Sequence, residues 1–166
     1  HRILVLDGAM GTAIQQHQLG PEAFGGPQYE GCNEHLVLTR PDVIRGIHEA
    51  YLEAGADILE TGTFGATPLV LDEYGLSDRA HAINTAGARL AREAADRFSK
   101  PGRPRWVAGS MGPTTKAMSV TGGVTFPELV EHYLAQARGL HEGGVDYFLL
   151  ETCQDTRNIK AGLVAL

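Results

Sequence analysis

The chain has 166 residues, of which 43% are hydrophobic and 20% charged, and its formal net charge is -6. These values are typical of one globular domain with a substantial core. The acidic balance and the scattered Lys and Arg residues argue against a basic nucleic-acid surface, and no apolar run approaches the ~20 residues of a membrane helix. The two cysteines form no CxxC pair, and two thiols cannot build a disulfide framework. We therefore expect a cytoplasmic protein without nucleic-acid or membrane partners.

Four short apolar runs are expected to form β-strands. Residues 3–6 are continuously apolar, which is typical of a strand buried on both faces. The later runs are residues 58–59, 106–110 and 147–150, and each follows a break that contains glycine or proline. The last run, "YFLL", is likewise expected to be buried.

The segments between these runs carry apolar residues at helical spacing. We expect a first helix with Thr39 as its N-cap, Pro41 in its first turn and Gly55 just after its end. A short helical turn follows at residues 67–75. Ser77 is then expected to cap a longer helix that ends at the break "KPGRP".

Two further helices complete the pattern. Thr125 and Glu128 form a T-x-x-E capping box at the start of one helix, which is expected to end at the glycine pair 143–144. Asp155 is expected to cap the last helix. Residues 18–35 and 111–123 have no periodicity and are expected to be long loops. The expected core stripes are Val43, Ile44, Ile47, Tyr51 and Ala54; Ile83, Gly87, Leu90, Ala94 and Phe98; Leu129, Tyr133, Leu134, Ala137 and Leu140; and Ile159, Leu163 and Leu166.

The order strand then helix occurs four times, which predicts an α/β protein with a parallel sheet and right-handed crossovers. Two similar stretches, "EAGADILETGTF" and "EGGVDYFLLETCQD", indicate a repeated unit. A doubly wound sheet and part of a (β/α)8 TIM barrel both fit this order. The first turn, "DGAMGT", lacks the G-x-G-x-x-G fingerprint, and polar residues gather after every strand, so we favour the barrel. Residues 1–166 would supply about the first four βα units as one domain.

Three of the expected strands end on an acid: Asp7, Glu60 and Glu151. In a barrel these side chains would converge on one rim, and unpaired charges there are costly to desolvate. A metal ion or the ammonium group of an amino acid would balance them. The alternative is that each acid only caps the turn after its strand.

The rest of the same rim is rich in small residues. Glycines allow backbone N–H groups to approach a ligand, and successive N–H groups can hold an anion. Acids for an ammonium and amides for a carboxylate together favour a zwitterionic amino acid over a metal. The small rim residues are Gly8, Gly62, Gly65, Gly112, Thr61, Thr63, Thr114 and Thr115.

The histidines and cysteines give weaker signals. The histidines after His1 share no motif, and we interpret them as surface or helix-flanking residues: His17, His35, His48, His81, His132 and His141. Cys153 is close enough to Glu151 in sequence to contact a ligand, although a small buried hydrophobic role is commoner for such a cysteine.

The motifs "ILVLDGAMGTAIQ", "GADILETGTFGAT", "VAGSMGPT" and "LLETCQDTRNIKAGLVAL" closely resemble the homocysteine-binding domain of cobalamin-dependent methionine synthases. More distant relatives are the homocysteine methyltransferases that use betaine or S-methylmethionine. The resemblance covers nearly the whole chain except the loops 20–31 and 117–124. It implies a (β/α)8 barrel that transfers a methyl group to the sulfur of homocysteine, giving methionine.

The resemblance also implies a set of site residues. Asp7 and Glu151 match the acids that hold the ammonium of homocysteine, and Gly8 and Ala9 match the positions where backbone amides meet its carboxylate. The segment "ETGTF" matches the "ETNTF" motif of the family, which places Glu60, Thr61 and Thr63 in the site and puts glycine in place of the usual Asn at position 62.

The family holds its substrate sulfur on a zinc ion with three cysteines, in an "NC" motif and a "GGCCG"-type motif. Neither motif occurs here, so we assign no metal ligand and no catalytic residue to residues 1–166 and expect the zinc ligands outside them. The chain starts at His1 and stops within a helical pattern, and we expect a segment of a longer protein that alone is inactive.

Three functional hypotheses remain open. The first is the N-terminal half of the substrate barrel of a methionine synthase, in which other modules of the same polypeptide bind methyltetrahydrofolate and cobalamin. The second is a stand-alone homocysteine methyltransferase with another donor. The third is a non-catalytic half-barrel that pairs with a partner chain.

Overall fold

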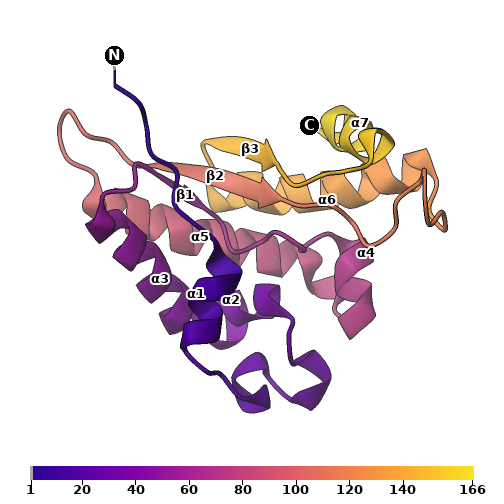
Figure 1. Ribbon diagram of the computed structural model, residues 1–166, viewed down its shortest axis with the longest axis horizontal. Coiled ribbons are helices and arrows are strands. Elements are labelled where there is room, and N and C mark those ends of the chain that lie inside the picture. Colours follow the sequence, from indigo (N-terminus) through magenta and orange to yellow (C-terminus); the bar gives the residue numbers. More distant parts are fainter. Residues whose placement is uncertain (1) are drawn as a thin grey trace.

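A computed structural model describes residues 2–166 (Figure 1). Its sheet has three parallel strands in the order β1 (Ile58–Glu60), β2 (Trp106–Met111) and β3 (Tyr147–Leu150). In the register, Leu59 lies opposite Val107, and Ser110 lies opposite Leu149. The carboxyl ends of all three strands therefore lie at the same edge of the sheet.

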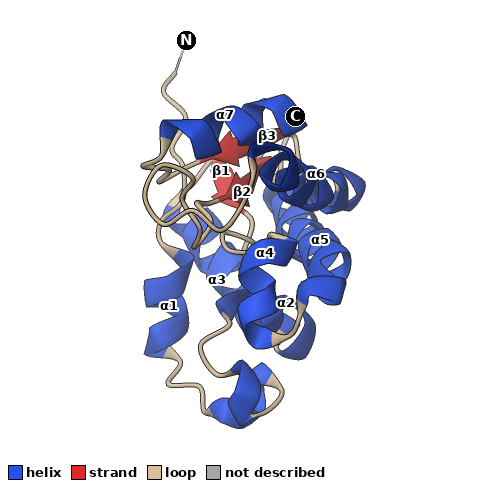
Figure 2. Cartoon of the chain, turned by 90° about the vertical axis from the view of Figure 1, so that its right-hand side faces the viewer, coloured by secondary structure: helices blue, strands red, loops and turns tan. Residues whose placement is uncertain are grey.

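The helices lie mainly on one side of this sheet, where α3, α5 and α6 form a layer and α7 packs against α6 (Figures 1 and 2). Two facts show which strand faces they cover. Leu59 and Val107 belong to a core cluster with alanines of α5, and Met111 belongs to a second cluster with residues of α6 and α7. The helices are α1 (Met10–Gln16), α2 (Leu36–Thr39), α3 (Pro41–Ala54), α4 (Pro68–Leu71), α5 (Ala80–Phe98), α6 (Phe126–Gly143) and α7 (Thr156–Ala165).

Strand alternation places the terminal acids on the opposite face. Leu59 points toward the helices, so its neighbour Glu60 points away from them. The same two-residue alternation applies to the other strands. On β2, Met111 faces the helices and Ser110 does not. On β3, Leu150 faces the helices, and Glu151, which follows it, does not. Glu60, Ser110 and Glu151 thus share the face that is the interior in a barrel.

The expected strand at residues 3–6 is the clearest difference from the sequence prediction. The segment lies beside β1, where the Asp57 and Ile58 amides donate to the Val5 carbonyl, but it forms only one parallel bridge, Leu6 to Ile58. It is also exposed, to 91% at Ile3. The prediction of burial was wrong because β1 pairs with only one edge of the segment, and every residue in it remains at least 38% exposed. Strand β3 is half-buried for a similar reason, with Tyr147 exposed.

Most helix ends follow the sequence prediction. Gly55 and Gly144 are left-handed C-caps, the Thr125–Glu128 capping box is formed, and Asp155 accepts the Arg157 amide at the start of α7. The helical turn at 67–75 is also confirmed, as α4 and a 3₁₀ turn.

Two predicted caps were wrong. Thr39 ends α2, and its hydroxyl donates back to the His35 carbonyl at 3.4 Å, a local bond that competes with capping. Ser77 begins a 3₁₀ turn ahead of α5. The predicted stripe of α7 was wrong as well. Leu163 and Leu166 are exposed, because a face of small residues that includes Gly162 packs onto Leu150 instead.

The α5–α6 contact depends on glycine. A Cβ added at Gly143 would lie 2.3 Å from Ala88 Cβ and 2.8 Å from the Thr85 carbonyl oxygen. The two helices therefore approach too closely for any side chain at this position, which sets how tightly the outer layer covers β2 and β3. Within residues 2–166, no helix combines the length and the apolar character that crossing a membrane requires.

The repeated unit forms the same local structure twice. The Asp57 amide donates to the Val5 carbonyl while its carboxylate accepts the Val5 amide, and Asp146 makes the same pair of bonds with Val107. Arg105 pairs with Asp57 at 2.6 Å, and Arg92 pairs with Asp146 at 2.8 Å. Each aspartate thus joins the amino end of its strand to the neighbouring extended segment, which is residues 3–6 for Asp57 and β2 for Asp146.

Candidate amino-acid site

A cavity of about 320 Å³ lies at the carboxyl ends of the strands. The cavity is bordered by the turn after residues 3–6, by the segments that follow β1 and β3, and by the loop before α2. Its lining residues are Gly8, Ala9, Met10, Gly11, Asn33, Glu34, Glu60, Thr61, Gly62, Phe64, Ser110, Glu151 and Thr152.

The three strand-end acids meet at this cavity. Glu60 and Glu151 line it, and Asp7 adjoins them, because its Oδ1 accepts the Glu60 amide at 3.0 Å. Burial raises the pKa of Asp7 to about 7, and repulsion by Glu60 and Glu151 adds to this shift. Burial also raises the pKa of Glu60 to about 7, with repulsion from Glu151 and a hydrogen bond to it as further causes.

No Lys, Arg or His is among the described residues that line the cavity. Two glutamates within hydrogen-bonding reach of one another cannot both ionise at low energetic cost, so the pair retains a proton near neutral pH. A cation that enters the cavity would relieve this repulsion. The arrangement can therefore bind an ammonium group and exchange it for protons.

Gly8 and Ala9 contribute main chain to the lining of the cavity. Gly8 packs so closely on Tyr51 that an added Cβ would lie 2.9 Å from the Tyr51 hydroxyl oxygen. The Tyr51 hydroxyl in turn donates to the Ala9 carbonyl at 3.4 Å. These contacts hold the backbone of Gly8 and Ala9 at the cavity wall, just before α1 begins.

The two predicted threonines use their hydroxyl groups inside the protein. Thr61 Oγ1 and Thr63 Oγ1 are 2.6 Å apart. Thr61 Oγ1 also accepts the Ser110 amide, and Thr63 Oγ1 donates to the Ser110 carbonyl, each at 2.9 Å. Both threonines are buried, and Thr61 lines the cavity whereas Thr63 does not.

A family model described as homocysteine S-methyltransferase matches residues 4–166. The chain belongs to this family. Its fold is also similar to three crystal structures of the homocysteine methyltransferase MmuM from Escherichia coli. The metallated form has a TM-score of 0.79 at 25% sequence identity, the oxidized form 0.77 at 25%, and the apo form 0.72 at 24%.

The alignments cover 98–99% of this chain but 54–59% of the MmuM chains. The chain thus spans a little over half the length of these family members. Its three parallel strands and their helices correspond to part of a (β/α)8 barrel, and the predicted fold class is confirmed.

The described residues do not fit the zinc ion that the resemblance implies. Within residues 2–166, no group of three His, Cys, Asp or Glu side chains is arranged to hold a metal ion. Cys32 is buried, and burial raises the pKa of its thiol to about 11. Cys153 Sγ donates to the Glu151 carbonyl at 3.2 Å and lines a separate small cavity.

Sequence reasoning missed several lining residues, and Ser110 is the most informative. Its hydroxyl donates to Glu151 Oε1 at 2.5 Å. Period-2 alternation across β2 could have placed it on the same face as the acids. Asn33 and Glu34 come from a loop with no periodicity, so no sequence signal pointed to them. Glu34 Oε1 accepts the Gly65 amide at 2.8 Å.

Two histidines correct the surface interpretation. His48 on α3 is 0% exposed, and neither ring nitrogen has a hydrogen-bond partner in the described part of the chain. Burial lowers its pKa to about 4, so it packs as a neutral ring. His35 is buried too, with Nδ1 2.9 Å from the Phe24 carbonyl oxygen.

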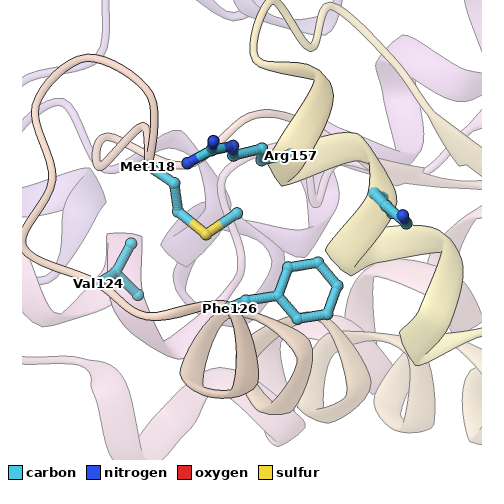
Figure 3. A pocket seen from close by; sticks show the side chains of 5 residues that line it. Met118, Val124, Phe126 and Arg157 are labelled. Carbon is cyan, nitrogen blue, oxygen red and sulfur yellow. The ribbon is translucent and has the colours of Figure 1, made fainter.

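A larger cavity, of about 600 Å³, lies between α7 and the loop before α6 (Figure 3). Figure 3 shows Met118 extending toward Phe126, with Arg157 on the neighbouring helix. Lys160 is the second basic residue that lines this larger cavity, and no carboxylate is among the described residues of the lining. Its chemistry therefore differs from that of the acidic cavity, which remains the candidate site.

Proposed function

We propose that the acidic cavity binds the amino-acid part of homocysteine. In this proposal Asp7, Glu60 and Glu151 surround the ammonium group, and the backbone of Gly8 and Ala9 faces the carboxylate. Thr61 and Thr63 act by fixing the cavity wall. The observation that carries the proposal is the meeting of three acids at a cavity that main chain of Gly8 and Ala9 helps to line and that no basic residue among the described residues lines.

The intact protein would then transfer a methyl group to the homocysteine sulfur and release methionine. A free thiol has a pKa near ~8.5, so attack at neutral pH requires a group that favours the thiolate. Zinc would supply this chemistry, and its ligands are expected outside residues 1–166. The part proposed for these residues is to bind and orient the substrate, as the N-terminal half of a barrel domain.

For the parent protein we propose a cobalamin-dependent methionine synthase, with methyltetrahydrofolate and cobalamin bound by other modules of the same polypeptide. The support is the close resemblance of "GADILETGTF" and "DTRNIKAGL" to that class. The likeness to MmuM favours a second candidate, a stand-alone methyltransferase that uses a donor such as S-methylmethionine or betaine. The complete sequence of the parent protein separates the two, because only the first requires further domains.

Glu151→Gln in the intact protein tests the proposed site. The amide keeps the shape of the side chain but removes its charge, so homocysteine affinity measured by calorimetry should fall by about tenfold to a hundredfold. Glu142→Gln is the matched control, because Glu142 is an exposed residue on the outer surface of α6 that pairs with Arg89.

The ligand supplies a second arm of this experiment. The deamino analogue of homocysteine lacks the ammonium group, so it should bind the wild-type protein and Glu151→Gln with similar, weak affinity. Unchanged homocysteine affinity in Glu151→Gln, or an equal loss for both ligands, would contradict the proposed role of the acids.

A further inference from the structure

A closed set of hydrogen bonds fixes Ser110 beside the acids. The Ser110 amide donates to Thr61 Oγ1, and Thr63 Oγ1 donates to the Ser110 carbonyl, each at 2.9 Å. The 2.6 Å contact between the two threonine hydroxyls completes the set, which we call the Thr61–Thr63–Ser110 ring. Because Thr63 gives its hydrogen to Ser110, it must accept from Thr61. Every hydroxyl hydrogen of the two threonines is therefore used.

The ring is anchored from outside the sheet and leaves one group free. Gln136 on α6 donates to the Thr63 carbonyl at 2.7 Å, so the helix layer holds the ring in place. Ser110 is 2% exposed, and its own hydroxyl takes no part in the ring. That hydroxyl donates to Glu151 Oε1 at 2.5 Å.

A hydroxyl donor acts on a carboxylate in two ways. It restricts the rotation of the carboxylate, and it favours the charged form over the protonated form. Glu60 is the neighbour with which Glu151 shares a hydrogen bond, and no hydroxyl group of the described residues donates to the Glu60 carboxylate. Because the pKa of Glu60 is raised to about 7, mainly by burial, Glu60 can carry the proton of this hydrogen bond near neutral pH.

We infer that Ser110 is the positioning residue of the ammonium site, which holds the Glu151 side chain directed into the cavity while Glu60 carries the shared proton. This inference rests on the proposed binding of an amino acid at the same acids. It adds that the threonines of the "ETGTF" segment act on the ligand indirectly, through the ring and the serine. An entering ammonium then pairs with a preformed carboxylate on Glu151, and the proton on Glu60 leaves to solvent.

Several titratable groups face this pair. Asp7 approaches from the turn after residues 3–6, and Glu34 lines the cavity from the loop before α2. Tyr147 on β3 is close enough that Glu60 and Asp7 contribute to the raised pKa of its hydroxyl. Among the described residues, none of these three groups donates a hydrogen bond to the Glu151 carboxylate, so none takes the place of Ser110.

The test is a double-mutant cycle on the intact protein with homocysteine as the ligand. Ser110→Ala should weaken binding about tenfold at pH 6.5, where Glu60 is mostly protonated and the pair shares a proton, and less than about threefold at pH 8.5, where Glu60 is mostly ionised. The ratio of variant to wild-type affinity cancels the titration of the homocysteine thiol. In a Glu151→Gln background the same substitution should change affinity by less than about twofold.

Two further variants separate positioning from general damage. Ser99→Ala is the matched control, because the Ser99 hydroxyl is also hydrogen-bonded, to the Ala95 carbonyl and from the Arg105 amide, but lies at the end of α5 away from the cavity. It should leave affinity unchanged at both pH values. Ser110→Cys keeps the volume of the side chain with a weaker donor, and it should show the same pH-dependent loss if Ser110→Ala does not fold.

The outcomes distinguish this inference from the proposed function. A loss that is independent of pH, or that persists in Glu151→Gln, would overturn the role of Ser110, as would wild-type affinity in both serine variants. A wild-type protein that binds no homocysteine would instead refute the proposed function itself.

Discussion

Lowering the pH from 8 to 6 should weaken the binding of methionine, the proposed product, to the intact protein. Asp7 and Glu60 both have a pKa raised to about 7. Only their ionised forms attract an ammonium group, so bound ligand favours loss of their protons. Affinity should therefore rise as the pH rises through 7 and level off above it. Methionine is the better probe because its thioether, unlike a thiol, does not titrate.

The size of the effect follows from the two pKa values. A group with a pKa of about 7 is roughly 90% ionised at pH 8 and roughly 10% ionised at pH 6. If binding requires one particular acid to be ionised, affinity falls about tenfold over this range. If binding requires both acids to be ionised, affinity falls about a hundredfold. The ammonium and carboxylate of a free amino acid keep their charges over this range, so the protein causes the change.

Calorimetry at pH 6.5 in two buffers of different ionisation enthalpy measures the same effect as protons released per ligand bound. We expect between one and two protons for the wild-type protein and about one fewer for Glu60→Gln. An affinity that does not change between pH 6 and 8, or a net uptake of protons on binding, would refute the reasoning.

Three further predictions concern the free energy of unfolding, and each is measured by urea unfolding of the intact protein. Glu60→Gln should stabilise the ligand-free protein by about 1 kcal/mol at pH 8, because a raised acid pKa means that stability falls as the pH rises toward 7; an equal gain at pH 5 would contradict this cause. Asp57→Asn should destabilise by about 3 kcal/mol, because it leaves the buried Arg105 without its charged partner; a loss below 1 kcal/mol would count against a buried pair. Gly143→Ala should cost about 2 kcal/mol through overpacking, whereas Gly46→Ala, in a helix position where an added Cβ meets nothing within 4 Å, should stabilise by up to about 1 kcal/mol. Equal effects of the two alanines would show that the α5–α6 contact relaxes.

The order of strands and helices could be predicted from sequence because its signals are local. Gly55 and Gly144 end helices in the left-handed conformation that the sequence indicated, and the Thr125–Glu128 box needs only four residues to form. Burial, by contrast, depends on what lies across the fold. Residues 3–6 have the composition of a buried strand, yet their exposure is set by which neighbours cover them.

The candidate site shows the same division. Asp7, Glu60 and Glu151 could be expected to meet because parallel strands bring their carboxyl ends to one edge, and the structure places all three there. The direction of the Thr61 and Thr63 hydroxyl groups could not be expected, since it depends on the register with β2. A buried histidine without a partner, such as His48, likewise has no sequence pattern that separates it from a surface histidine.

The two ends of the sheet offer a comparison within one molecule that bears on why acids end the strands. At the amino ends, Asp57 and Asp146 each accept a backbone amide and pair with arginines, and the pKa of Asp57 is lowered. At the carboxyl ends, Asp7 also accepts a backbone amide, so it too could have been a structural cap. Yet no arginine or lysine within residues 2–166 lines that cavity, and the pKa values of Asp7 and Glu60 are raised to about 7. A purely structural acid gains stability from a basic partner, as Asp57 does. The acids at the carboxyl ends keep an unfavourable repulsion that only protonation or a bound cation removes, which favours the proposed binding site over a structural cap.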